Sequence, residues 1–359
     1  MSEDDKPAVK AKLPSARDIS RKDFTPHGIK SKGGSKPSAL TAADAARRKR
    51  AIISGLVVAA LAVAGGTTYW LTRPEPKIEV RGAYGKEPAV SFKGVKPDPK
   101  LKSTKVVPVI KGKGATVAKG DFAFINASTY VWGAKKKGKL LQSTFKSGKP
   151  APLQIGGEQS LPGLTKGLTG AKVGSRVLLE IPPADGLGAQ GSPEAGVSGT
   201  DTLVFIVDVV GTYNKNSVVS GTPVKTDPKL PEVTGGAAGQ APAVKIPKGD
   251  APDKLSATPL IQGTGPVVTK GQTLVMQYHG VLWRNGKVFD STWQRGEPFI
   301  TAIGAGKVVP GWDKGLVGQK VGSRVLLVVP PKEGYGSQGQ GEIKGTDTMV
   351  FVVDVVAAY

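Results

Sequence analysis

The longest apolar stretch of the chain runs from Ala51 to Thr72, where 22 consecutive residues carry no charge. As a helix it would be about 33 Å long, enough to cross a bilayer core of roughly 30 Å. Tyr69 and Trp70 lie at its far end, where amphipathic rings prefer the membrane interface, and a basic run that ends at Arg50 precedes it. The pattern predicts a transmembrane helix, with the N-terminus in the cytoplasm and all later residues outside.

Two other interpretations of this stretch stay open. Ala62-Val63-Ala64 resembles a signal-peptidase site after a short apolar core, so that cleavage would release a secreted protein. A buried helix of a soluble domain is the second alternative, but the flanking segments offer no core for it to enter. The predicted localisation is the cell membrane, single-pass, with the folded domains extracytoplasmic, or secreted if cleavage occurs near Ala64.

Strand-like patterns dominate the last third of the chain. Thr273–Trp283, Ser323–Val329 and Thr346–Ala357 are rich in β-branched residues, which is typical of central antiparallel strands. Asn285-Gly286 indicates a two-residue hairpin turn. Val308–Gly318 is a short segment of helical length bounded by glycines. The pattern predicts an α+β domain in which an antiparallel sheet wraps around one short helix, because that arrangement buries both elements.

The same pattern occurs twice. Lys172–Leu179 reads KVGSRVLL, and Lys320–Leu327 repeats these eight residues. Gly199-Thr200-Asp201-Thr202 recurs as Gly345-Thr346-Asp347-Thr348. A period of about 148 residues is too long for a solenoid repeat and fits two tandem copies of one domain. We therefore expect two homologous domains, called below the first copy and the second copy.

The repeat and the changes in composition predict six segments. The first 50 residues contain 13 Lys and Arg against 6 Asp and Glu without apolar periodicity, as in a disordered tail. Pro-rich and Lys-rich or Gly-rich stretches precede each copy and predict extended connections. The segments are a basic cytoplasmic tail (1–50), a transmembrane helix (51–72), a spacer (73–99), the first copy (100–213), a linker (214–243) and the second copy (244–359).

Composition excludes some classes of function. The chain has no cysteine, which excludes disulfides, thiol nucleophiles and cysteine-based zinc sites. Its net charge of +22 is spread over linkers and strands without a recognition helix, so no nucleic-acid partner is expected. Anionic envelope polymers or lipid headgroups are more natural partners for an exported basic protein. Lys135-Lys136-Lys137 is the sharpest basic patch, and a solvated loop is its simpler interpretation.

A series of short motifs runs over most of the length of the second copy. Each motif alone is weak, but their order and spacing together are specific. The motifs are Lys270-Gly271-Gln272, Tyr278-His279-Gly280, Gly286-Lys287-Val288-Phe289-Asp290-Ser291, Pro298-Phe299, Val308-Val309-Pro310-Gly311-Trp312, Val321-Gly322-Ser323-Arg324, Gly334-Tyr335-Gly336 and Val350-Phe351. Together they resemble the FKBP family of peptidyl-prolyl cis/trans isomerases. This resemblance implies two tandem FKBP-like domains, in agreement with the predicted sheet and helix.

The resemblance also implies a pocket with Trp312 as its floor, on which the substrate proline ring lies. Arg295 would pair with Asp290, and Gln340 replaces a histidine of the best-known members in a loop that shapes selectivity more than rate. His279, beside Tyr278, should face the opposite side of its strand. Catalytic roles are implied for Tyr278, Phe289, Asp290, Val309, Trp312, Tyr335 and Phe351, and substrate-binding roles for Arg295, Phe299, Val308 and Gln340.

Apolar and aromatic residues suit the isomerisation of an Xaa–Pro amide bond. Rotation about an Xaa–Pro amide has a barrier of roughly 18–20 kcal/mol because resonance is lost. A water-poor pocket favours the twisted amide, which has less charge separation than the planar one, and no metal, nucleotide or other cofactor is needed. Taken singly, an aromatic such as Trp312 is more often a core residue. The joint placement of the motifs is what favours a site.

The first copy keeps the scaffold but lacks the lining. Phe205 matches Phe351, whereas the positions of Tyr278, Phe289, Asp290, Trp312 and Tyr335 hold Ala127, Leu141, Gln142, Leu164 and Leu187. We expect it to be a spacer or a chaperone-like module with little or no isomerase activity. The whole chain is expected to isomerise proline-containing polypeptides during the folding of exported proteins, and the resemblance implies macrolide inhibitor binding. The alternative is a non-catalytic, membrane-anchored chaperone-like or envelope-binding protein.

Overall fold

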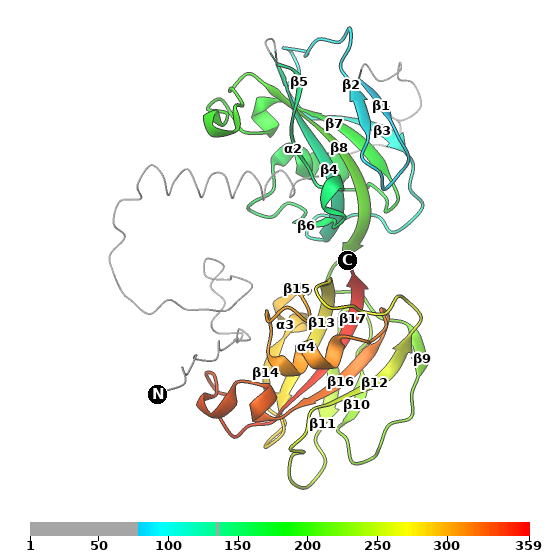
Figure 1. Ribbon diagram of the computed structural model, residues 1–359, viewed down its shortest axis with the longest axis vertical. Coiled ribbons are helices and arrows are strands. Elements are labelled where there is room, and N and C mark those ends of the chain that lie inside the picture. Colours follow the sequence, from blue (N-terminus) through cyan, green and yellow to red (C-terminus); the bar gives the residue numbers. More distant parts are fainter. Residues whose placement is uncertain (1–77, 134–135) are drawn as a thin grey trace, which may run out of the picture. The chain divides into compact units, whose positions relative to one another are not determined.

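The computed structural model describes residues 78–133 and 136–359, which form two compact units that join between Tyr213 and Asn214 (Figure 1). Each unit contains one copy of the repeat. The predicted tail (1–50) and membrane helix (51–72) lie outside the described residues. Among the residues that are described, no helix is long and apolar enough to cross a membrane.

The C-terminal unit is an antiparallel sheet with strand order β14-β13-β17-β16-β12-β9, and β15 also pairs with β13 (Figure 1). Its strands are β9 (Gly221–Pro223), β10 (Glu232–Gly235), β11 (Pro242–Lys245), β12 (Ser256–Gly263), β13 (Thr273–Leu282), β14 (Val288–Ser291), β15 (Phe299–Ala302), β16 (Arg324–Val329) and β17 (Met349–Ala358). Its helices are α3 (Thr292–Arg295) and α4 (Pro310–Leu316), with 3-10 turns η5 (Pro331–Glu333) and η6 (Gly336–Gln338). The strands and the helix expected from the apolar pattern are therefore confirmed.

Helix α4 packs closely on the inner face of the sheet. Pro310 occupies its first turn, where a missing N–H is harmless. Gly315 faces β16 so tightly that a Cβ there would lie 2.7 Å from Leu327. Because glycine permits this approach, Trp312 and Leu316 on the same helix become fully buried against the strands. The helix thus places an indole in the centre of the inner core.

The N-terminal unit repeats this architecture, with strand order β3-β7-β8-β4-β5 and with β6 paired to β4. Its strands are β1 (Glu79–Arg81), β2 (Ala89–Ser91), β3 (Lys105–Ile110), β4 (Phe122–Gly133), β5 (Lys136–Ser143), β6 (Ala151–Gln154), β7 (Arg176–Ile181) and β8 (Thr202–Tyr213). Helix α2 (Pro162–Leu168) corresponds to α4, and the 3-10 turns are η2 (Phe145–Ser147), η3 (Pro183–Asp185) and η4 (Pro193–Ala195). The tandem duplication predicted from the repeat is confirmed.

The register of the strands supports the alignment of the two copies. Ala127 pairs with Val207 in the first copy as Tyr278 pairs with Val353 in the second. The backbone N–H of Ala127 donates to the hydroxyl of Thr144 at 2.8 Å, and that of Tyr278 makes the same bond to Thr292 at the same distance. The positions compared in the sequence are thus equivalent in space.

Parts of 73–99 and 214–243, which were expected to be extended connections, form hairpins instead. Strands β1 and β2 form a hairpin, as do β10 and β11. Each hairpin, called here an arm, contributes apolar side chains to a cluster on the outer face of its sheet, including Val80 and Val90 in the first unit and Val233 and Val244 in the second. Valines at these positions outweigh the Pro-rich and Lys-rich composition, because they bury apolar surface against the sheet.

A buried arginine ties each arm to its sheet. Arg176 bonds both oxygens of Asp208 and donates to the carbonyls of Gly82 and Lys86. Arg324 makes the equivalent pair with Asp354 and donates to two arm carbonyls, at 2.9 Å each. We call each of these arrangements a clasp. The clasps make the arms part of the folded units.

Candidate active site

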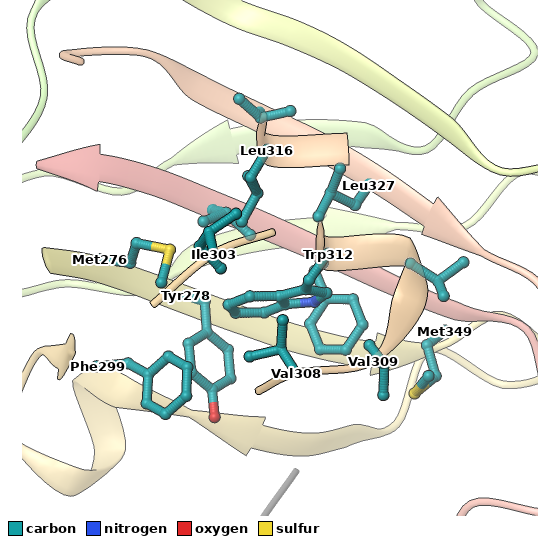
Figure 2. Close-up of a cluster of buried hydrophobic side chains, with 14 of the residues drawn as sticks. Met276, Tyr278, Phe299, Ile303, Val308, Val309, Trp312, Leu316, Leu327 and Met349 are labelled. Atoms are coloured by element: carbon teal, nitrogen blue, oxygen red, sulfur yellow. The ribbon is translucent and has the colours of Figure 1, made fainter. Parts of the chain in front are cut away.

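Four aromatic rings converge on the inner face of the C-terminal unit. Trp312 on α4 lies with its ring centroid 5.0 Å from that of Tyr278 on β13 and 5.2 Å from that of Phe351 on β17. Phe299 on β15 is 5.9 Å from Trp312, again in an edge-to-face arrangement. Figure 2 shows the indole above the rings of Tyr278 and Phe299, with Val308 and Val309 beside it. The predicted floor and walls of the pocket are therefore brought together.

Residual exposure distinguishes the mouth of this cluster from its floor. Trp312, Tyr278 and Phe351 are 0% exposed, whereas Phe289 is 9% and Phe299 is 7% exposed. Val308 and Tyr335 retain a similar small exposure. Among the buried members of the cluster, these four residues and Ile343 have more than 1% exposure, so a substrate would approach the indole past them. Phe289 also packs its ring edge-on against Phe351, with centroids 5.4 Å apart.

A charged network lies beside the rings. The Tyr278 hydroxyl and the Arg295 guanidinium both donate to the carboxylate of Asp290. A second N–H of Arg295 donates to the Tyr278 hydroxyl at 3.1 Å, and its guanidinium lies 5.1 Å from the centre of the tyrosine ring. The pairing expected between Arg295 and Asp290 is thus present. It fixes the wall formed by Tyr278 through three mutually bonded side chains.

Burial and neighbouring charges shift the pKa values of this network. Burial raises the pKa of Asp290, against the opposing effects of Arg295 and the Tyr278 hydroxyl. Burial and the Asp290 charge both raise the pKa of Tyr278 far above its usual value. Burial alone would lower the pKa of Arg295, but Tyr278 and Asp290 outweigh it and raise that pKa. The tyrosine therefore stays protonated as a hydrogen-bond donor, and the arginine stays charged.

The loop that precedes α4 offers a backbone donor. Val309 is the N-terminal cap of the helix, and its carbonyl accepts from the N–H of Trp312 at 2.9 Å. Within the part of the chain that the structure describes, the N–H of Val309 donates no hydrogen bond. Val309 lies beside the indole in Figure 2 and is 0% exposed, so within the described structure its N–H is an unpaired, buried donor.

Sequence reasoning missed two residues that support the site. Ile343, 7% exposed, belongs to the same apolar cluster and reaches it from the loop that carries Gln340. Thr292 accepts from the N–H of Tyr278 and donates back to its carbonyl, which holds β13 against the end of β14. Ile343 follows Gln340 by three residues, and the equivalent position of the first copy holds Val197. An apolar residue in both copies of this loop is the signal that could have identified it. His279 pairs in register with Val352 of the outer cluster, so it faces away from the site as expected.

The first copy presents a different surface at the same place. Its core contains Ala127, Leu164 and Phe205, with Leu141 and Leu187 partly buried against it. Gln142 pairs with Thr129 in the register that Asp290 shares with Gly280. The aromatic floor and the charged network are therefore absent from this part of the described structure. In both units, no group of His, Asp or Glu among the described residues could hold a metal ion.

Both copies of the repeat are similar to known proteins. A family model described as FKBP-type peptidyl-prolyl cis-trans isomerase matches residues 113–210 and 265–356. An FK506-binding protein of Streptomyces anulatus is 41% identical over 120 residues, which are 33% of this chain and 97% of that protein. Peptidyl-prolyl cis-trans isomerase FKBP9 of Rattus norvegicus is 30% identical over 219 residues, 61% of this chain but 32% of that protein. The crystal structure of AtFKBP13 is 32% identical and covers 30% of this chain and 96% of its own, with a TM-score of 0.28.

Proposed function

The chain belongs to the FKBP-type peptidyl-prolyl cis-trans isomerase family, and from this premise we propose that its second copy catalyses isomerisation during the folding of exported proteins. One observation carries the assignment to this copy. The rings around Trp312 and the network of Tyr278, Asp290 and Arg295 occur in the second copy. At the equivalent positions the first copy keeps one ring, Phe205, and otherwise has small, aliphatic or uncharged polar side chains.

The proposed mechanism uses desolvation and positioning. The substrate proline ring enters past Phe289 and Phe299 and lies on the indole of Trp312, where water is excluded. The planar amide loses more solvation there than the twisted amide, so the barrier falls. The N–H of Val309 holds a neighbouring substrate carbonyl while the amide rotates. No bond is broken, and each 1.36 kcal/mol of preferential stabilisation gives about tenfold in rate.

The first copy is proposed to bind unfolded chains or to act as a spacer without isomerising them. Leu164 fills its core but offers no flat aromatic floor, and Gln142 cannot replace the carboxylate of Asp290 in a charged network. Its sheet and its arm, which packs apolar side chains on the outer face, support a stable fold that does not depend on a catalytic pocket. A non-catalytic role for the whole chain is the alternative that this copy favours.

Anchoring and inhibitor binding are further parts of the proposal. The charge-free stretch 51–72 supports a membrane anchor with both units outside the cytoplasm, and the Ala62-Val63-Ala64 sequence supports secretion as the alternative. The mass of the N-terminal peptide of the mature protein decides between them. The FK506-binding name of the Streptomyces relative supports binding of FK506, which should inhibit the second copy.

Matched substitutions in the full-length chain test the assignment. Phe351 and Phe205 occupy equivalent, fully buried positions, so Phe351→Leu and Phe205→Leu remove similar core contacts. We expect Phe351→Leu and Trp312→Leu each to lower kcat/KM for an Xaa–Pro peptide by about tenfold or more, equivalent to about 1.4 kcal/mol. Phe205→Leu should leave kcat/KM unchanged. Equal losses from Phe351→Leu and Phe205→Leu would show that both copies contribute, and unchanged rates in all variants would remove the pocket from the mechanism.

A further inference from the structure

The loop that brings Ile343 to the pocket is a compact unit. We call residues 336–348 the pocket loop. Gln340 and Ile343 exchange backbone hydrogen bonds of 2.7 and 2.9 Å. Asp347 accepts from the N–H of Lys344 at 2.8 Å through its carboxylate. A Cβ on Gly345 would lie 1.9 Å from the carbonyl oxygen of Ser337, so the two ends of the loop touch. The pocket loop is therefore tied together by contacts within its own backbone.

Two cationic side chains attach the pocket loop to the turn between β13 and β14. The Arg284 guanidinium lies 2.8 Å from the carboxylate of Asp347, and its second nitrogen donates to the carbonyl of Glu342 at 3.4 Å. Lys287 lies 2.8 Å from the carboxylate of Glu342. Asp347 is almost fully buried, whereas Lys287 and Glu342 are about half exposed. The turn thus holds the loop at a buried and an exposed point.

The first copy keeps only the first of these contacts. Lys136 pairs with Asp201, which corresponds to Asp347 and likewise accepts a backbone N–H of its own loop. Lys139 stands at the position of Lys287 and makes no ion pair among the described residues. Gly196 precedes Val197 where Glu342 precedes Ile343. The second contact therefore occurs in the copy that has the aromatic pocket.

We propose that Arg284 and Lys287 are positioning residues that hold the pocket loop over the bound substrate and thereby set its affinity. The inference rests on the proposed function of the second copy. Ile343 offers an apolar contact that is the same for a planar and a twisted amide, so losing it weakens ground state and transition state equally. Release of the loop should therefore raise KM and leave kcat unchanged.

Reversing one charge, or exchanging both charges, of the exposed pair Lys287 and Glu342 in the full-length chain tests the proposed positioning role. An exposed ion pair contributes up to about 1 kcal/mol, so Lys287→Glu should raise KM for an Xaa–Pro peptide about two- to fivefold at low salt. The double variant Lys287→Glu with Glu342→Lys should restore KM to within about twofold of the wild type. The difference between wild type and Lys287→Glu should shrink in 1 M NaCl, where the screening length is about 3 Å. Glu342→Gln is a milder second variant if Lys287→Glu folds poorly.

A distant ion pair provides the control. Lys245 and Glu232 form an exposed pair on the arm, so Lys245→Glu reverses an equivalent charge without touching the loop and should not change KM. An unchanged KM in Lys287→Glu, or a raised KM that the double variant does not restore, would overturn the inference.

A readout without catalysis separates this inference from the proposed function. Amide hydrogen exchange of Lys344 and Asp347 should be faster in Lys287→Glu than in the wild type, and the double variant should slow it again. If the wild-type chain shows no isomerase activity, the proposed function fails while this measurement still decides the role of the two cations. Equal exchange rates in all three proteins would overturn that role.

Discussion

Removing the clasp arginine of the C-terminal unit should strongly destabilise that unit. Arg324→Leu deletes a guanidinium that bonds both oxygens of Asp354, at 2.7 and 2.8 Å, and two carbonyls of the arm. Asp354 is completely buried. Leaving one partner of a buried pair without the other costs about 3–5 kcal/mol. Because a domain is typically stable by about 5–15 kcal/mol, the loss is a large fraction of the total.

The pH dependence of this loss follows from the state of Asp354. Burial already raises the pKa of Asp354 above its usual value of 3.8, against the opposing effect of Arg324. Without the arginine that pKa rises further, so the folded variant holds a proton that the unfolded chain has released. The destabilisation should therefore be small below pH 3.8 and should grow as the pH rises through the folded pKa.

Urea unfolding of the full-length chain, followed by fluorescence and circular dichroism, is the assay. The two units should give separate transitions, and Arg324→Leu should move only one of them. Arg176→Leu is the matched variant, because Arg176 and Asp208 are both completely buried, and it should move the other transition by a similar amount. The double variant Arg324→Leu with Asp354→Leu should recover much of the lost stability, since no lone charge remains buried.

Two results would refute this reasoning. If Arg324→Leu lowers the free energy of unfolding by less than about 1 kcal/mol, the pair contributes no more than a surface ion pair. If the double variant is as unstable as the single variant, the loss comes from the released arm rather than from the unpaired carboxylate of Asp354.

Other outcomes are expected in and around the site. Burial lowers the pKa of His279 below 6.5, so its contribution to stability should be lost as the pH falls below that value. The free energy of unfolding in urea should therefore differ less between pH 5 and pH 8 in His279→Ser than in the wild type, and an equal difference would contradict this. Gly345→Ala should raise KM several-fold, because its Cβ would collide with the backbone of Ser337, and an unaltered KM would show that the pocket loop yields easily. Tyr278 should resist ionisation above pH 10.0 in an absorbance titration at 295 nm until the unit unfolds, since burial and Asp290 raise its pKa; early titration of every tyrosine would contradict the network.

Local patterns predicted the fold of the copies well. The β-branched runs that became β13, β16 and β17 are buried on both faces, and few alternatives bury such runs. The turn at Asn285-Gly286 and the helix begun by Pro310 also follow from local chemistry. The exact repetition of KVGSRVLL in the sequence was enough to predict that the domain is duplicated.

The arms could not be predicted in the same way. Their strands are three or four residues long, and they lie among prolines, lysines and glycines that favour extended connections. Their stability comes from tertiary contacts with the outer face of the sheet and from the clasps. The carbonyls bonded by Arg324 are 88 and 89 residues away from it in the chain, and no local pattern marks them as its partners.

The candidate site was predicted through resemblance more than through residue patterns. Trp312, Phe299 and Phe351 taken singly look like core residues, and in the structure they are indeed buried in the core cluster. Their shared role depends on strands and a helix that meet only after folding. The contact of Lys287 with Glu342 depends in the same way on a loop and a turn that are distant in the chain.

The two clasps also show which part of the module is independent of the pocket. Both Arg–Asp pairs and their bonds to the arm occur in each unit, although the aromatic lining occurs in one of them. The side of the sheet that carries the arm therefore tolerates very different side chains on the opposite side. Residues of the inner face can be exchanged without removing the attachment of the arm.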